Sequence, residues 1–268
     1  MDGGRLRVSN IRWVSAITAR SRAGSTRNEV PSPPSQPKAS AHGPFSTTDV
    51  PKPQPRPPSR DVADVSRRHA ASVNVPASLT SVNLMETLAA WAQGLARSLL
   101  ANDLPRRWSH VQGVAARARS LAPSLGSDAD LLEAAAWLHD IGYLPELAAT
   151  GLHGLDGARY LRDVQHAEPL LCRLVAHHSC AVIEAEERGL AHVLTREFAP
   201  PPQHLADALT FCDMTTSPDG QQVQVHHRLA EIHDRYGTGH LVSRSIRRAT
   251  PLILQAVGQV NARAARTS

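Results

Sequence analysis

Several residue types are scarce in this chain, and each scarcity argues against a class of protein. Only three of the 268 residues are cysteines, namely Cys172, Cys180 and Cys212, an odd number without paired spacing. A disulfide framework or a cysteine-based zinc finger is therefore not expected, and a reducing, cytoplasmic setting fits best. Apolar runs are too short for a signal peptide or a membrane span, so we expect no membrane association.

Lysine is nearly absent, since Lys38 and Lys52 are the only two. Residues 1–80 hold 12 basic and 5 acidic side chains, whereas residues 81–268 hold 17 and 19. The overall charge of +5 therefore comes from the first segment. We do not expect the second segment to bind nucleic acid, and any phosphate contact in it must come from arginine, backbone amides or metal.

Residues 1–80 also lack apolar periodicity, and 11 of the 20 prolines lie there. A segment of this composition cannot bury enough apolar surface to fold. We predict a disordered Pro/Ser/Arg-rich N-terminal tail over residues 1–80 and a folded domain over residues 81–268. Because the globular sequence begins abruptly, a translation start near Val82 or Met85 stays an alternative.

The folded segment has few aromatic residues and no alternating pattern typical of β-strands. Its apolar residues recur at three- and four-residue steps, which is typical of amphipathic helices. We therefore predict an all-α fold, a compact multi-helix bundle whose C-terminal helices cover residues 222–265. Helices are predicted from about residue 83 to 100 and over 105–121, 127–142, 154–165, 168–179, 181–194, 203–215, 222–236 and 239–265.

The pair His139-Asp140 is the most informative feature of the domain, because it ends the apolar helical segment AAAWLHD. An imidazole and a carboxylate in a buried turn need a partner that satisfies both. A divalent metal ion is the natural candidate. His110, one helix earlier, and Asp213, far downstream, offer further ligands of the same types. Two imidazoles and two carboxylates suit Mn, Fe, Co, Ni, Zn or Mg.

The order His110, His139-Asp140, Asp213 resembles the HD-domain superfamily of metal-dependent phosphohydrolases, over roughly residues 100–220. The resemblance implies that these four residues bind a metal ion and that Asp140 is the central catalytic residue. It also implies a metal-activated water that attacks a small phosphoester or nucleotide. A small phosphorylated substrate is therefore the expected partner, whereas the oligomeric state is left open.

His153 and the consecutive pair His177-His178 resemble the extra ligands of binuclear HD-domain enzymes. In that arrangement Asp140 would bridge two ions. Alternatively, these histidines line a pocket around a single ion, so one or two ions are expected. Arg107 is the candidate for a phosphate contact, because its planar guanidinium can donate two hydrogen bonds to a phosphate. A solvated arginine at a helix start is the alternative.

One subgroup of the family does not match. Its members cleave cyclic dinucleotides and carry a lysine directly after HDIG and a GYP motif downstream of their HH pair. Here Tyr143 follows HDIG, and no such GYP motif is present. Two other functions stay open, namely a di-iron oxygenase of the HD type and a non-catalytic, metal-stabilised domain for ligand sensing or regulation.

Overall fold

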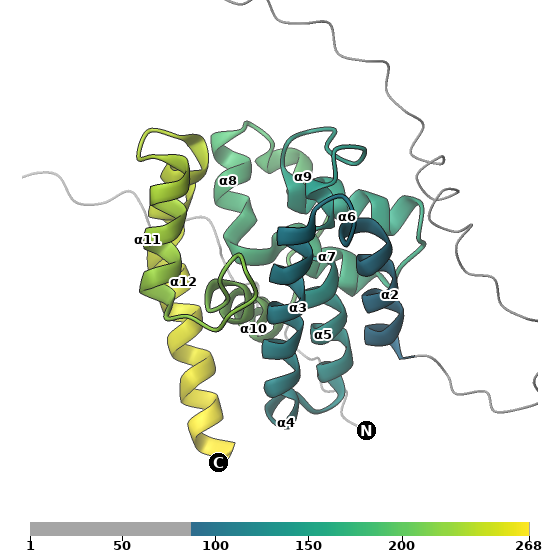
Figure 1. Cartoon of the computed structure of the whole chain (residues 1–268), viewed down its shortest axis with the longest axis vertical. Helices are drawn as coiled ribbons and strands as arrows, with labels where there is room; N and C mark the ends of the chain where they lie inside the picture. The colour runs from purple at the N-terminus through teal and green to yellow at the C-terminus, as the bar shows by residue number, and fades with distance from the viewer. Residues whose placement is uncertain (1–86, 268) are drawn as a thin grey trace, which may run out of the picture. The chain divides into compact units, whose positions relative to one another are not determined.

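The computed structural model describes residues 87–267, which form a bundle of helices joined by short turns (Figure 1). These residues contain no β-strand, so the prediction of an all-α fold is confirmed. None of the helices in this range is long and apolar enough to cross a membrane. The predicted tail, residues 1–80, and the alternative start near Val82 or Met85 lie outside the described residues.

The helices follow the predicted order closely. A predicted helix over 181–194 is in fact two, because Gly189 adopts a φ of 69° and ends the first. Three 3-10 turns are η1 (Gly126–Asp128), η2 (Ile141–Tyr143) and η3 (His178–Cys180). The α-helices are α2 (Leu88–Leu100), α3 (Pro105–Ser120), α4 (Ala122–Leu125), α5 (Ala129–Leu138), α6 (His153–Asp163), α7 (Pro169–His177), α8 (Ala181–Glu187), α9 (Ala191–Glu197), α10 (Gln203–Met214), α11 (Val225–Tyr236) and α12 (Leu241–Thr267).

Helix α5 forms the centre of the bundle. It packs against α2, α3, α7 and α10, and its second half, from Ala134 to Leu138, is completely buried. Three consecutive alanines there let neighbouring helices approach closely on several sides, because their side chains add little bulk. Figure 1 shows α3 and α5 running side by side. The carboxyl end of α5 therefore emerges in the interior, where a polar side chain has little access to water.

Helices α11 and α12 pack together and form one side of the bundle (Figure 1). Buried apolar residues of α12, such as Ile253 and Val257, face the core, and the helix packs on α10 and α8. Arg248 on its outer face pairs with Glu186 and Glu187 of α8. These two helices bring the C-terminal part of the chain next to the end of α10, where Asp213 lies.

Candidate metal centre

His139 and Asp140 lie just past the end of α5, not within its last turn as predicted. The helix ends at Leu138, and the turn η2 begins directly after Asp140. The chain turns here because Gly142 packs against α6. A Cβ atom at Gly142 would lie 2.0 Å from the carbonyl oxygen of His153, a contact that only glycine permits. The same contact brings α6, and with it His153, close to Asp140.

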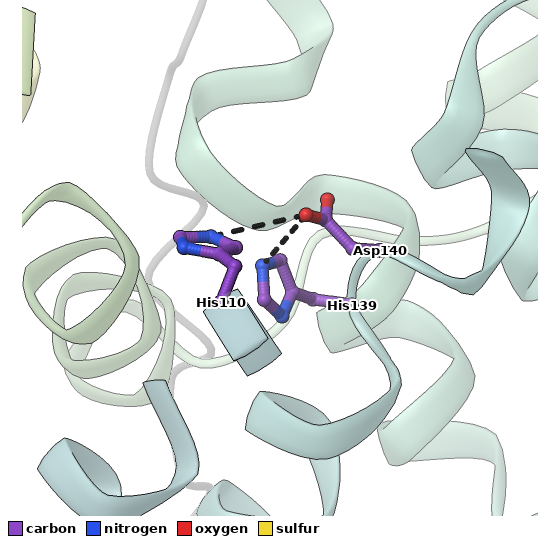
Figure 2. Close-up of side chains that lie close together, drawn as sticks. All are labelled: His110, His139 and Asp140. Carbon is purple, nitrogen blue, oxygen red and sulfur yellow. Dashed lines mark ion pairs between the residues drawn. The ribbon is translucent and has the colours of Figure 1, made fainter. Parts of the chain in front are cut away.

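Four imidazoles face the carboxylate of Asp140. The Nε2 atoms of His110 and His139 lie 3.8 Å and 3.5 Å from its Oδ2, and Figure 2 shows the three side chains converging. The Nε2 atoms of His153 and His178 lie 3.5 Å and 3.9 Å from its Oδ1. Asp140 therefore belongs to two groups of possible metal ligands, one on each of its oxygens.

Three of these four imidazoles are oriented by the backbone. In each, Nδ1 is hydrogen bonded to a main-chain carbonyl, which can only accept, so Nδ1 carries the proton and Nε2 presents its lone pair to the cluster. Metal-binding histidines are commonly held in this way. The hydrogen bonds join His110 to Ser217 (2.9 Å), His139 to Ala136 (2.8 Å) and His178 to Val175 (2.7 Å).

The free Nε2 atoms provide a test of whether a cation fits. That of His139 is buried and has no hydrogen-bond partner among the described residues, and burial lowers the pKa of this histidine to about 4. Burial likewise lowers the pKa of His153, whose Nε2 lies 3.0 Å from that of His178. The contact between His153 and His178 can be a hydrogen bond in the protein alone, but the buried, unsatisfied nitrogen of His139 is unfavourable there. A divalent ion on each side of Asp140 would bind these nitrogens, so the residues fit such ions.

Asp213 lies near the end of α10 and joins the first group. Its Oδ1 is 3.1 Å from Nε2 of His110, and its other oxygen accepts a hydrogen bond from the hydroxyl of Ser179. Burial alone would raise the pKa of Asp213, but the neighbouring side chains of His110, His139 and Arg228 hold it far below its usual range. Asp213 is therefore an anionic ligand candidate, and Ser179 orients it.

Among the residues predicted for a second ion, His177 is the one that the structure does not bring to the cluster. Its Nε2–H donates a hydrogen bond to the carbonyl oxygen of Phe198, at 2.7 Å. Helix α7 ends at His177, and the backbone at His178 is extended, so the two adjacent side chains point in different directions. Only His178 faces Asp140, and His177 instead links α7 to the end of α9.

Arg107, predicted as a substrate contact, lies directly at the cluster. Its Nη1 donates to Oδ2 of Asp140 at 2.6 Å, and its guanidinium lies 3.9 Å from the centre of the Tyr143 ring. Burial would raise the pKa of Asp140, but Arg107 and the histidines together hold it well below its usual range. The central carboxylate is thus ionised.

A cavity opens beside the cluster toward α11 and α12. Its lining includes Asp140, His153 and His178 from the cluster and Arg228 and Arg235 from α11. The sequence analysis did not select these two arginines. Their spacing of seven residues places them on one face of a helix, but the same spacing is common on solvated helix faces.

Comparison with known proteins is consistent with this geometry. A family model of the HD domain matches residues 107–213, a segment that begins at Arg107, ends at Asp213 and contains every histidine of the cluster. No curated protein matches the chain, and no solved structure does. Helices α11 and α12 lie beyond the matched segment. HD domains bind divalent metals, and most of them are hydrolases. The comparison therefore identifies an HD domain over residues 107–213, the part of the chain that carries the cluster.

Proposed function

We propose that this protein is a metal-dependent phosphohydrolase that acts on a small phosphoester or nucleotide. The observation that carries the proposal is the position of Asp140 between two sets of imidazole nitrogens, each close enough together to hold a metal ion. One divalent ion would be held by His110, His139, Asp140 and Asp213, and a second by Asp140, His153 and His178. When bound, such ions lower the pKa of a coordinated water and polarise phosphoryl oxygens.

The protein contributes rigid ligands. The Nδ1 hydrogen bonds of His110, His139 and His178 to backbone carbonyls fix both the ring orientation and the tautomer. Ligands held in this way need not reorganise during the reaction, which favours electrostatic stabilisation of a developing charge. Asp140 stays ionised, so it keeps both oxygens available for the two sides of the cluster.

Arg107 is the proposed substrate contact next to this cluster. One of its five N–H donors is used by Asp140, which leaves others to bind phosphoryl oxygens. The ring of Tyr143 stacks on the guanidinium and restrains its orientation at the cavity wall. Ile232 and Ile246 also line the cavity and would limit access of water to the bound phosphoester.

The experiment that tests the proposal combines metal analysis with phosphate release. The full chain is purified without chelators and without air, and then assayed on a panel of nucleotides and phosphoesters with Mn, Fe, Zn or Mg. We expect two ions per chain and phosphate release from members of the panel. Asp140→Asn should lose metal and reduce the rate about 10³-fold or more, because bound ions supply several kcal/mol of transition-state stabilisation.

Asp207→Asn is the matched control, because Asp207 is 4% exposed and Asp140 3% exposed, yet Asp207 lies outside the cluster. This variant should keep both ions and the activity. Absence of phosphate release with every ion and every substrate would contradict the proposal. Substrate-dependent oxygen uptake by the iron-loaded protein, without phosphate release, would instead favour an oxygenase.

A further inference from the structure

The cavity beside the metal cluster has a second polar wall, formed by α11. Arg228 and Arg235 are seven residues apart on this helix and line the same cavity as Asp140 and His178. Because α11 lies after the segment matched by the HD-domain family, residues 107–213, this wall is a feature of this chain beyond the family match.

The charges on this wall are not balanced. Glu231 accepts hydrogen bonds from both Arg228 and Arg235, so one carboxylate serves two guanidinium groups. Glu184, a glutamate that lines the cavity, is already paired at 2.6 Å with Arg188, which follows α8. The α11 wall therefore presents a net positive charge to the cavity.

Asp213 does not remove this excess. Its Oδ1 lies 4.0 Å from Nη2 of Arg228, too far for a direct hydrogen bond, and the same oxygen is 3.1 Å from Nε2 of His110. Asp213 is also the anionic ligand candidate of the metal cluster. Its negative charge would therefore be shared between a bound cation and Arg228, and the charge of the α11 wall would be compensated only in part.

Besides the unbalanced charge, Arg228 gives a second indication of a ligand-binding site. It is 5% exposed, yet its Nε has no hydrogen-bond partner among the residues that the structure describes. A buried guanidinium donor without an acceptor costs free energy, so its retention next to a cavity points to an acceptor supplied by a ligand. Arg235 also lines an adjoining cavity together with Arg106 and Arg107. Arg235 therefore lies between the two cavities, close to Arg107 at the cluster.

We propose that Arg228 and Arg235 form an anion-binding subsite, and that the substrate carries a second anionic group beside the phosphoryl group that reacts, as a nucleoside diphosphate does. The proposal rests on the phosphohydrolase function given above: the metal cluster and Arg107 hold the reacting group, and the α11 wall holds the second. Planar guanidinium groups match phosphate or carboxylate oxygens through paired hydrogen bonds.

The test is a titration of the manganese-loaded full chain, with unbound manganese removed. The two probes are adenosine monophosphate and the non-hydrolysable α,β-methylene analogue of adenosine diphosphate, which share the nucleoside and differ in the second phosphate. We expect the analogue to bind about 10-fold or more tightly, since a hydrogen bond to a charged group contributes at least that factor. Arg235→Gln and Arg228→Lys should lose this preference while their affinity for the monophosphate stays unchanged.

Arg159→Gln is the matched control, because the Arg159 side chain is 30% exposed and ion-paired with Glu197, whereas that of Arg235 is 28% exposed and ion-paired with Glu231. The control should keep the preference. Equal affinity of the two probes for the native protein would overturn the proposal, as would equal weakening of both probes in Arg235→Gln. If Arg228→Lys does not fold, Arg235→Gln alone decides the outcome.

The titration needs no turnover, so it separates the two proposals. A retained preference for the diphosphate analogue in a protein that releases no phosphate would contradict the phosphohydrolase function and leave the anion subsite standing. Phosphate release by a protein that binds both probes equally would support the phosphohydrolase function and contradict the anion subsite.

Discussion

The two walls of the central cavity hold their polar groups in different ways. On the cluster side, His110, His139 and His178 are each tied by Nδ1 to a backbone carbonyl. On the α11 side, Arg228 and Arg235 are long side chains that share the single carboxylate of Glu231. Imidazoles that would bind a metal ion must be positioned to within a few tenths of an ångström, and hydrogen bonds to the backbone fix them. Guanidinium groups that only supply positive charge can be carried by long, flexible side chains.

The two walls also differ in their relation to the HD-domain match. The HD-domain match ends at Asp213, before α11 begins at Val225. The matched segment holds the residues proposed to perform the chemistry. The wall proposed to choose the substrate is built by the following helices, α11 and α12. A change of substrate within such a family can therefore arise by altering the C-terminal helices while the cluster stays intact.

The largest expected effect comes from the adjacent histidines on the cluster side. His178→Ala should lose one of the two ions and reduce phosphohydrolase activity about 10²-fold or more, because it removes an imidazole that faces Asp140. His177→Ala removes only a hydrogen bond to Phe198, so it should keep both ions and cost about 1 kcal/mol of stability. Elemental analysis and urea unfolding measure the two effects. Loss of metal in His177→Ala alone would reverse the assignment.

The second prediction compares two glycines, one in each region. Gly142→Ala should destabilise the protein by about 3 kcal/mol or more, since the new Cβ would meet the His153 carbonyl oxygen at 2.0 Å and the Gly157 nitrogen at 2.7 Å. A Cβ atom at Gly258 on α12 would meet no atom within 4 Å, so Gly258→Ala should stabilise by about 0.5–1 kcal/mol. Urea unfolding of both variants tests the pair. Similar stabilities of the two variants would show that η2 and α6 can move apart at little cost in free energy.

The third prediction concerns the loop that orients His110. Gly220 adopts a φ of 79°, and a Cβ there would lie 2.3 Å from the carbonyl oxygen of Ser109. Gly220→Ala should therefore displace the loop and weaken the hydrogen bond from His110 to the Ser217 carbonyl. Loss of such a supporting contact lowers metal affinity about 10- to 100-fold. Competition with a chromogenic chelator measures this; an unchanged affinity would show that His110 does not depend on the loop.

Some residues of the cluster could be predicted from the local sequence pattern. His110, His139, Asp140 and Asp213 are polar side chains within apolar helical segments, and such side chains need a partner when buried. The bend after Leu138 was not predictable, because it depends on the packing of Gly142 against α6. This contact joins residues of two different elements. Periodicity reports only which residues of one helix share a face.

His177 and the arginines of α11 show two further limits of the sequence. Two consecutive histidines look equivalent in a sequence, and only the orientation of α7 decides that His178 faces Asp140 while His177 faces Phe198. Arg228 and Arg235 look like residues of a solvated helix face. Their role depends on how α11 packs beside the cluster, and long-range packing of this kind leaves no trace in local spacing.

The smallest expected effect tests whether the C-terminal helices can be weakened without touching the cluster. Ile253 of α12 is completely buried, and Ile253→Val removes one methylene from the core at a cost of about 1 kcal/mol. Because α12 supplies none of the residues that face Asp140, metal content should stay at the native level. Urea unfolding and elemental analysis of the same sample measure both quantities. A loss of metal from so small a change would mean that the packing of α12 also holds the cluster in place. The helices proposed to select the substrate could then not change without affecting the metal-binding residues.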